Sequence, residues 1–462
     1  MTTATAEERA KYDKAFLGHP VGLIYLVFAE AFERFSYYGM RALLTLYLAQ
    51  LLLLPGHVEH VIGFSWFSHI LEHIYGPMKI AGMTSVIVGL YGFTYLTPLF
   101  GGFIADQWLG RRATITIGAI IMAFGHFLMA FEQSFLIALA CILIGVGCFK
   151  GNISSQVGAL YGKNDVRRGT AFQIFYLVFN IAVIVAPIVC GTLGQKIAWH
   201  WGFGAAGVSM VLGLLVYLSG RKWLPEEPPR TKAGRDAAPA FVKGDGTKVI
   251  LLLVMLPLMA TSLVMNEQIF NNYLTWANDN LSFHFLGQDL PSSWLISLDA
   301  TMSMVFLTAS IAFWKWWSTK WKEPDEMAKI AFAGFFAALA PLALAAAAMT
   351  VAPGHKASLW WAIIFEVLND IGFANLVPVG LALFARVAPQ RVNGTMIGVY
   401  MLTFFGADML AGALGQYLEP LGAFKFWLLH AGLVGGAAVG LFIFWRLFHK
   451  QMAPSPALDA AA

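Results

Sequence analysis

The sequence predicts an all-α membrane protein with about twelve transmembrane helices in two bundles of six. Of its 462 residues, 58% are hydrophobic and only 12% are charged, whereas a soluble domain carries about 25% charged residues. Continuous apolar runs long enough to cross a bilayer alternate with short loops that are rich in lysine and arginine. One longer polar stretch divides these runs into two sets. Together these observations favour a polytopic helical membrane protein over any soluble class.

The apolar runs define the expected helices in chain order. We expect spans over residues 20–50, 82–105, 112–131, 135–157, 169–193, 201–220, 247–276, 293–318, 327–350, 356–386, 391–417 and 424–448. The N-terminal bundle then comprises residues 1–220, with an extracellular loop over 51–80, and the C-terminal bundle comprises residues 247–462. The stretch 221–246 contains four prolines and many charges, so we expect a flexible cytoplasmic linker there.

The distribution of positive charge predicts the orientation. Twenty-three of the 30 lysines and arginines fall in the two termini and in the loops on their side, and only four fall in the opposite loops. The positive-inside rule therefore places both termini in the cytoplasm of a multi-pass plasma-membrane protein, and we expect a bacterial inner membrane. The net charge of +4 reflects this loop bias, so we expect no nucleic-acid partner. Two six-helix halves joined by a cytoplasmic linker resemble the major facilitator superfamily, whose substrate site lies at mid-membrane between the halves.

The first expected helix carries polar residues that a helix surrounded by lipid would not tolerate. They repeat at intervals of three and four residues, so they line one face of the helix. They are Glu30, Glu33, Arg34, Tyr37, Tyr38 and Arg41. A charge near the bilayer centre costs about 2.5–3.5 kcal/mol on insertion scales. The stripe is therefore predicted to face a polar interior and to mark the pathway of a solute, a proton or both.

Three motifs resemble those of one transporter family. Residues 30–41 resemble the ExxERFxYYG motif of the proton-dependent oligopeptide transporter family. Residues 147–155 resemble its FKPNISS motif, with Gly151 where proline is usual. Residues 175–187 resemble its FYxxIN…AP pattern. The resemblance is strong over residues 20–215 and patchier in the C-terminal half.

This resemblance implies a proton-coupled symporter that imports short peptides by alternating access. The proton gradient would supply the energy, and no cofactor is expected. Glu30, Glu33 and Arg34 would form the proton-coupling cluster of the first helix, and Glu267 matches the seventh-helix acid that takes up the transported proton. Protonation of Glu33 would free Arg34 for another partner. The expected partners are a peptide or peptide-like substrate, protons and membrane lipid, and we expect the protein to function as a monomer.

The resemblance also implies a set of substrate-binding residues. Arg41 and Lys150 would give the N-terminal half a cationic wall that suits a substrate carboxylate. Asn180 would hydrogen-bond the peptide amide or amine. The other expected members are the aromatic residues Tyr37, Tyr38 and Tyr91.

The C-terminal half departs from the family where a peptide's amino group should bind. The tenth-helix glutamate expected to receive that group is replaced by Phe373. Asp299 of the eighth helix and Asp370, one turn before Phe373, are two acids that could take its place, with Glu366 one further turn away. The sequence therefore leaves two substrates open. One is a short peptide, and the other is a peptide-like or other anionic metabolite without a free α-amine.

Histidines in the loop over 51–80 suggest a third and least favoured class. His69, Glu72 and His73 have the H-x-x-E-H spacing of a zinc hydrolase helix. The surrounding apolar residues instead predict an amphipathic helix at the membrane interface. We therefore expect no metal site and no enzymatic activity. A membrane metallohydrolase or a non-transporting receptor is kept as the alternative to a transporter.

Overall fold

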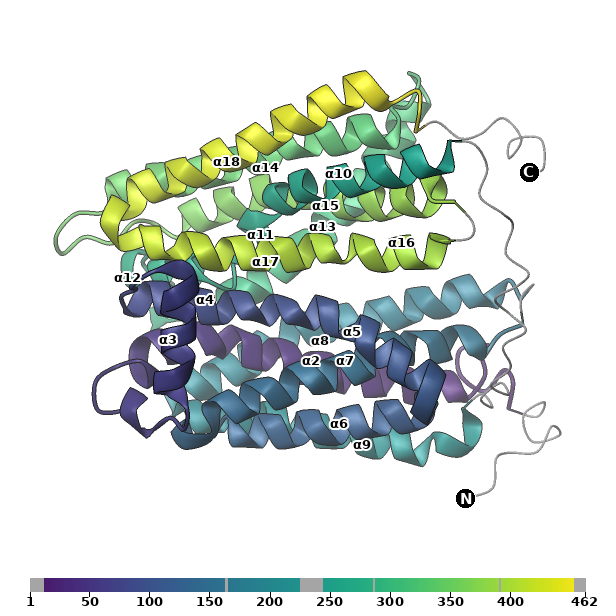
Figure 1. Ribbon diagram of the computed structural model, residues 1–462, viewed down its shortest axis with the longest axis horizontal. Coiled ribbons are helices and arrows are strands. Elements are labelled where there is room, and N and C mark those ends of the chain that lie inside the picture. The colour runs from purple at the N-terminus through teal and green to yellow at the C-terminus, as the bar shows by residue number, and fades with distance from the viewer. Residues whose placement is uncertain (1–11, 163–164, 225–243, 286, 390–391, 453–462) are drawn as a thin grey trace. The chain divides into compact units, whose positions relative to one another are not determined.

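The computed structural model is built almost entirely of α-helices (Figure 1) over the residues that it describes: 12–162, 165–224, 244–285, 287–389 and 392–452. Helices suit a bilayer because their backbone N–H and C=O groups are paired within the segment. The prediction of an all-α fold is confirmed. Most of the predicted linker, residues 225–243, lies outside the described residues.

The helices of the first six spans begin and end close to the predicted boundaries. They are α2 (Gly22–Tyr47), α4 (Ile80–Gly89), α5 (Phe93–Ile104), α6 (Arg111–Leu128), α7 (Phe135–Ala159), α8 (Arg167–Lys196) and α9 (Trp199–Ser219). A 3₁₀ turn at Leu90–Gly92 joins α4 and α5 into the second span. π-helical turns continue α2 over Leu48–Leu52 and α5 over Ala105–Leu109.

The later spans follow the same order as predicted. Their helices are α10 (Asp245–Ser262), α11 (Val264–Gln268), α12 (Asn272–Asn280), α13 (Trp294–Ser318), α14 (Glu326–Thr350), α15 (Trp360–Val387), α16 (Asn393–Tyr400), α17 (Leu402–Leu414) and α18 (Leu418–Phe448). Only Met401 separates α16 from α17, so the two form one span. The backbone leaves helical geometry at Gly422, where φ is 72°, and the last two spans are separated there.

Nine helical segments of the described residues are long and apolar enough to cross a membrane. One of them, Asn393–Phe448, is 56 residues long and contains two spans on either side of Gly422. The charged helix α2 and the helix α6, which begins with two arginines, fall outside the nine. These two helices, with the extra span in Asn393–Phe448, account for the difference from the twelve spans predicted.

The seventh span is broken, and the prediction of one continuous helix over 247–276 is wrong in this respect. It consists of α10, α11 and α12, with non-helical backbone at Asn271 (Figure 1). Side chains at the break hydrogen-bond to backbone groups of this span and of a neighbouring one. Gln268 Oε1 accepts a hydrogen bond from the Asn272 N–H at 3.1 Å, and Asn272 Nδ2 donates to the carbonyl oxygen of Gly415 at 3.2 Å. Such breaks are tolerated in a membrane where protein groups satisfy the backbone.

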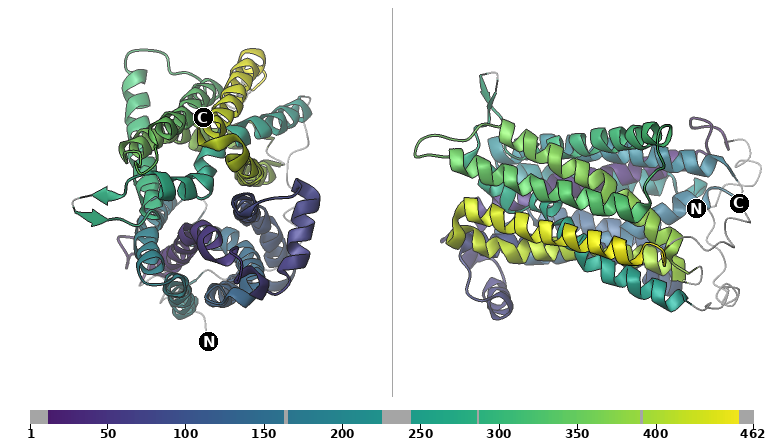
Figure 2. Two further views of the ribbon diagram at one scale, coloured as in Figure 1. Left: turned by 90° about the vertical axis from the view of Figure 1, so that its left-hand side faces the viewer. Right: turned by 90° about the horizontal axis from the view of Figure 1, so that it is seen from above.

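Two structured segments lie between spans. Helix α3 (Phe64–Tyr75) runs across the direction of the spans of its unit (Figure 1), and it exposes Trp66 and Ile74 while burying Leu71. The predicted amphipathic helix is therefore present. The strands β1 (His284–Phe285) and β2 (Gln288–Asp289) form an antiparallel hairpin that projects from the helices of its unit (Figure 2).

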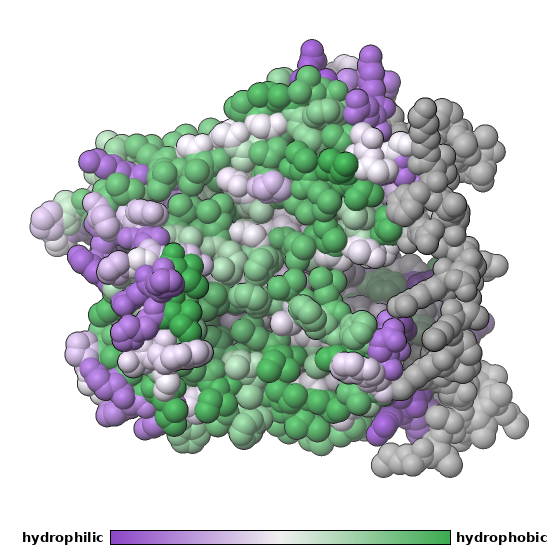
Figure 3. Space-filling view, viewed as in Figure 1, coloured by the Kyte–Doolittle hydropathy of each residue, from purple (hydrophilic) through white to green (hydrophobic). Residues whose placement is uncertain are grey.

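By their internal contacts, the residues fall into two units. The N-terminal unit consists of Met1–Gly76 and Phe93–Thr231, and the C-terminal unit of Pro77–Gly92 and Lys232–Ala462. The second span is thus divided at Gly92. Within the C-terminal unit, α4 packs tightly on α17. A Cβ at Gly89 would lie only 2.8 Å from the Cα of Gly412, so the absence of a side chain at Gly89 permits this close approach. In each unit, hydrophobic side chains cover the middle of the visible helices, and hydrophilic side chains gather near their ends (Figure 3).

Candidate functional site

The charged stripe of α2 is buried inside the N-terminal unit. Glu30, Glu33 and Arg34 are 4%, 0% and 1% exposed. The Nε atom of Arg34 lies 2.9 Å from Oε1 of Glu30 and 2.6 Å from Oε2 of Glu33. One guanidinium therefore pairs with both carboxylates, with Glu30 one helical turn before it and with the adjacent Glu33. A change in the charge of either acid would alter the partners open to Arg34.

Lys150 on α7 faces the same cluster. Its Nζ lies 4.5 Å from the ring centroid of Tyr95 and 5.7 Å from that of Tyr37. Lys150 also interacts electrostatically with Arg41 and with both carboxylates of the stripe. The cluster thus combines two acids with three bases, and its surplus of positive charge suits an anionic group.

The close approach of α5 and α7 brings Lys150 to this place. A Cβ at Gly101 would lie 2.0 Å from the carbonyl oxygen of Gly147, so only glycine fits at this crossing. Lys150 follows Gly147 by three residues, about one helical turn. Its side chain therefore reaches the aromatic rings on α2 and α5.

Aromatic and hydroxyl groups surround the charges. The Tyr37 hydroxyl and Thr94 Oγ1 share a 3.1 Å hydrogen bond. The ring of Tyr38 lies edge-on to that of Tyr37 at 5.0 Å and to that of Phe179 at 6.3 Å. The guanidinium of Arg34 lies 5.5 Å from the ring centroid of Phe179. These contacts hold the polar groups in position in a wall contributed by α2, α5 and α8.

The remaining predicted residues of this set have different surroundings. Arg41 is 1% exposed on α2. Asn180 is partly buried, and its Nδ2 donates a 2.7 Å hydrogen bond to the carbonyl oxygen of Tyr176 one turn earlier on α8. Tyr91 is fully buried in the 3₁₀ turn between α4 and α5 and belongs to the C-terminal unit.

The predicted acids of the C-terminal unit lie in two places. Glu267 is 2% exposed on the short helix α11, just before the break at Asn271 in the seventh span. Asp299 of α13 and Asp370 of α15 lie together, and Glu366 joins them from one turn earlier on α15. One oxygen of each of these three carboxyl groups lies within 4.8 Å of the others. Among the described residues, this is the one group of such side chains dense enough to surround a cation.

Phe373 occupies an apolar environment. It is partly buried and packs against the hydrophobic core of the C-terminal unit, which includes Met259 and Tyr400. A carboxylate at this position would have to be accommodated among apolar side chains. Phenylalanine in place of the family's glutamate at position 373 therefore fits the apolar side chains around it.

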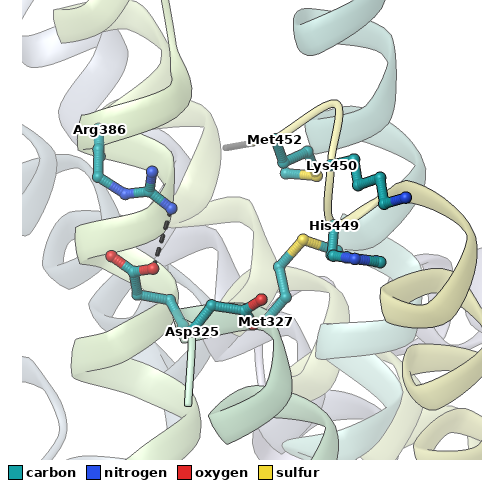
Figure 4. Close-up of a pocket in the computed structure, with 7 residues that line it drawn as sticks. Asp325, Met327, Arg386, His449, Lys450 and Met452 are labelled. Carbon is teal, nitrogen blue, oxygen red and sulfur yellow. Dashed lines mark hydrogen bonds and ion pairs between the residues drawn. The ribbon is translucent and has the colours of Figure 1, made fainter. Parts of the chain in front are cut away.

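Three cavities of the C-terminal unit lie away from these residues. One of about 340 Å³ lies at the ends of α14, α15 and α18, where Arg386 pairs with Glu326 at 2.9 Å (Figure 4). A second, of about 670 Å³, is lined largely by aromatic side chains of α13, α14 and α18. A third, of about 260 Å³, lies beside it and reaches Asn375. The residues that line these three cavities include none of the predicted site.

Several residues of these clusters were missed in the sequence. Thr94, Tyr95 and Phe179 contact the N-terminal cluster, and Tyr273 and Ser303 adjoin the acids of the C-terminal unit. Ser303 could have been found, because it follows Asp299 by four residues and so shares its helix face. Tyr273 follows two asparagines within an apolar span, which is a signal for polar packing.

Comparisons with known proteins identify the family. A family model described as the POT family matches residues 112–243. The protein YclF of Bacillus subtilis (strain 168), described as an uncharacterized transporter, is 30% identical over 454 residues, which cover 86% of this chain and 88% of YclF. The chain belongs to the POT family. A di-/tripeptide transporter of Lactococcus lactis subsp. cremoris is 27% identical over 89% of this chain and 91% of its own length.

Solved structures of the POT family share the fold. A crystal structure of a peptide transporter in complex with sulfate has a TM-score of 0.80 at 22% identity, over 97% of this chain and 99% of its own. A POT family transporter in complex with 5-aminolevulinic acid has a TM-score of 0.76 at 23% identity, over 96% and 98%. The predicted major facilitator fold is confirmed, and the chain is a multi-pass membrane transporter.

Proposed function

We propose that this POT family member is a proton-coupled symporter that imports di- and tripeptides by alternating access. The buried pairing of Arg34 with both Glu30 and Glu33 carries the proposal. When a proton neutralises Glu33, Arg34 keeps Glu30 as its only charged partner of the two carboxylates. Its guanidinium then becomes available to another anion. The proton gradient can thereby alter the salt bridges that hold one conformation. The di-/tripeptide transporters among the relatives support the substrate class.

In this proposal the substrate binds along the cationic wall of the N-terminal unit. Arg41 and Lys150 attract the peptide carboxylate, since Arg offers a forked pair and Lys a point charge. Tyr37, Tyr38 and Tyr91 provide aromatic and hydroxyl contacts, and Asn180 hydrogen-bonds the peptide amide. Glu267 takes up the transported proton in the C-terminal unit.

The amino group of the peptide binds Asp299 or Asp370 in this proposal, with Phe373 as an apolar neighbour. A second candidate function follows from Phe373 itself. Its packing against the hydrophobic core favours a cargo without a free α-amine, such as a peptide-like or other anionic metabolite. Both cargos use the same proton-coupling cluster.

We further propose that the protein is a monomer of a bacterial inner membrane, with both termini in the cytoplasm and no cofactor. The bacterial relatives and the bias of lysine and arginine support this placement. An enzymatic role has little support from the loop histidines. His69 Nδ1 donates a 2.6 Å hydrogen bond to the carbonyl oxygen of Ser65 on its own helix, and the relatives are described as transporters.

Uptake of labelled dialanine into proteoliposomes, with and without an inward proton gradient, tests the proposal. Accumulation that requires the gradient is expected. N-acetylated dialanine added as a competitor then separates the two cargos. Strong inhibition by dialanine with weak inhibition by its acetylated form supports recognition of the amine, whereas equal inhibition supports the second candidate. No dialanine uptake by folded protein would contradict peptide transport.

A further inference from the structure

An aromatic groove lies open on the surface of the C-terminal unit. It is the cavity of about 670 Å³ lined by α13, α14 and α18, and the smaller cavity beside it shares the residues Phe313, Trp314 and Phe332. The chain covers this face poorly, since α13 has the smallest buried share, 22%, of the nine candidate spans of the described residues. In a bilayer the exposed rings of Phe313 and Phe332 therefore lie against lipid.

The groove is held open by tryptophan rings whose orientation is fixed. Each of its three indole N–H groups donates a hydrogen bond within the protein: Trp314 to Asn375 Oδ1 at 2.7 Å, Trp317 to the carbonyl oxygen of Lys322 at 3.3 Å, and Trp445 to Asp325 Oδ2 at 3.3 Å. These bonds use the polar atom of each indole, so the surface that remains consists of ring faces and edges. Such a preformed apolar surface suits a hydrocarbon chain better than a polar ligand.

Three basic side chains stand at the mouth of the groove. Lys322 is one of its lining residues. Lys320, two residues earlier, has its Nζ atom 4.9 Å from the ring centroid of Trp316, and the guanidinium carbon of Arg446 on α18 lies 5.8 Å from the ring centroid of Trp445. All three bases are exposed, and within the described part of the chain none of them belongs to an ion pair. Their charges are therefore available to an anion.

The two acids that line the groove already have partners. Glu323 pairs with Lys329, whose Nζ also lies 4.5 Å from the ring centroid of Trp314. Asp325 caps α14, because its Oδ1 accepts a 2.7 Å hydrogen bond from the Ala328 N–H. The charge of Asp325 is outweighed by the three bases described above. The mouth of the groove therefore carries a net positive charge, and an anionic group complements it.

The position of the groove along the helices matches one leaflet of a bilayer. Helix α13 ends at Ser318 and α14 begins at Glu326, so the bases stand where two spans leave the hydrocarbon, an interface where tryptophan, lysine and arginine are typical. The smaller cavity reaches back along α13 to Phe306, twelve residues before Ser318. That is about 18 Å of helix, which is enough to cross half of a hydrocarbon core about 30 Å thick.

We propose that this groove binds one anionic phospholipid of the surrounding bilayer. Its phosphate lies among Lys320, Lys322 and Arg446, and one acyl chain follows the aromatic rings between α13 and α14. Phosphate alone would leave the apolar groove unused, and a zwitterionic headgroup would bring a cation to a mouth that is already positive. The site goes beyond the proposed function, because it takes a lipid rather than the cargo and does not depend on the identity of the cargo.

Native mass spectrometry of the full chain in detergent tests the proposal. Dioleoyl phosphatidylglycerol or dioleoyl phosphatidylcholine is added, and the dissociation constant of the first bound lipid is measured. We expect phosphatidylglycerol to bind about tenfold tighter, and Lys320→Gln/Lys322→Gln to weaken its binding by about tenfold or more, since two of the three cationic contacts are lost. Lys196→Gln/Lys425→Gln is the matched control, because it removes two exposed lysines that do not line the groove. That variant should bind like the wild type.

Two results would overturn the proposal. Equal affinity of the wild type for the two lipids would show that the mouth of the groove does not recognise negative charge. An unchanged affinity of Lys320→Gln/Lys322→Gln for phosphatidylglycerol would show that the charge is recognised elsewhere. The readout uses no peptide, so a failure of dialanine uptake leaves it interpretable.

Ala328→Trp tests the groove separately from its bases. Ala328 lines the groove, so a large ring there should block the acyl chain while the three bases stay in place. Phosphatidylglycerol binding is expected to fall, and unchanged binding would contradict the placement of the chain. Dimers in the same spectra that Ala328→Trp separates, and that lipid does not affect, would show instead that a second copy of the chain covers the groove.

A photoreactive phosphatidylglycerol locates the site in the wild type, without any substitution that could disturb folding. The reactive group is placed on the acyl chain, and the labelled peptides are identified after irradiation in lipid nanodiscs. Labelling within residues 313–335 is expected. Labelling confined to other spans would overturn the assignment to this groove.

Discussion

The buried acids of the two units have different neighbours. In the N-terminal unit, Glu30 and Glu33 share one guanidinium, and Lys150 stands nearby. In the C-terminal unit, Glu366 and Asp370 lie beside a third acid, and neither pairs with a described lysine or arginine. The first cluster is compensated by the chain itself, so a proton there exchanges one salt bridge for another. In the second cluster the carboxyl groups lie beside one another, so like charges would repel there.

Removal of Arg34 should have the largest effect, because it leaves two buried acids without their shared base. Breaking a buried ion pair in this way costs about 3–5 kcal/mol. Arg34→Ala should therefore lower the unfolding temperature strongly and abolish gradient-driven uptake, as measured by thermal unfolding of the purified protein and by proteoliposome assay. Arg386→Ala is the control, since the Arg386–Glu326 pair is about 30% exposed and such pairs contribute about 0–1 kcal/mol. Equal losses in the two variants would remove the contrast between the buried cluster and a surface pair.

Neutralising Glu33 should separate coupling from binding. Glu33→Gln keeps the shape of the side chain but cannot change charge, so Arg34 no longer alternates between partners. We expect dialanine exchange to continue, while gradient-driven accumulation falls by about tenfold or more, equivalent to about 1.4 kcal/mol. Counterflow and accumulation are measured in the same liposomes. Full accumulation by Glu33→Gln would exclude this role.

Neutralising Glu366 should disturb folding much less than removing Arg34. If Glu366 already carries a proton, glutamine replaces one neutral group by another of similar shape. Stability should then change by less than about 1.5 kcal/mol, the net worth of a typical hydrogen bond. Thermal unfolding of Glu366→Gln and Arg34→Ala side by side checks this order. A loss in Glu366→Gln as large as that in Arg34→Ala would indicate that Glu366 is ionised and paired.

The smallest effect is expected outside both clusters. His69 and His73 lie on α3, and His69 hydrogen-bonds its own helix. Replacing both with alanine should leave dialanine uptake unchanged within error. If the double variant folds normally but no longer takes up dialanine, the result would support a metal-dependent role for this loop.

The N-terminal cluster was largely predictable because it depends on one helix. Glu30, Glu33, Arg34 and Tyr37 share a face by helical spacing alone, and that spacing does not depend on tertiary packing. The position of Lys150 beside Tyr37 came from family resemblance, since the sequence does not report the glycine crossing of α5 and α7.

The C-terminal cluster could be predicted only in part. Asp370 and Glu366 share a helix face by spacing, but their approach to Asp299 and Tyr273 depends on the packing of α12, α13 and α15. Hydropathy gave no position for the break in the seventh span, although Asn266, Glu267, Gln268, Asn271 and Asn272 interrupt its apolar residues. The hydrogen bond from the Asn272 N–H to Gln268 Oε1 is a local contact that a window average of hydropathy does not detect.

The most direct test of the account measures dialanine and protons together. Proteoliposomes containing the wild-type chain and an internal pH dye are given dialanine outside, with no imposed proton gradient. The account predicts that the lumen acidifies as dialanine enters, and that Glu33→Gln uncouples the two signals. Dialanine entry without acidification would contradict proton-coupled symport, whatever the rate of uptake.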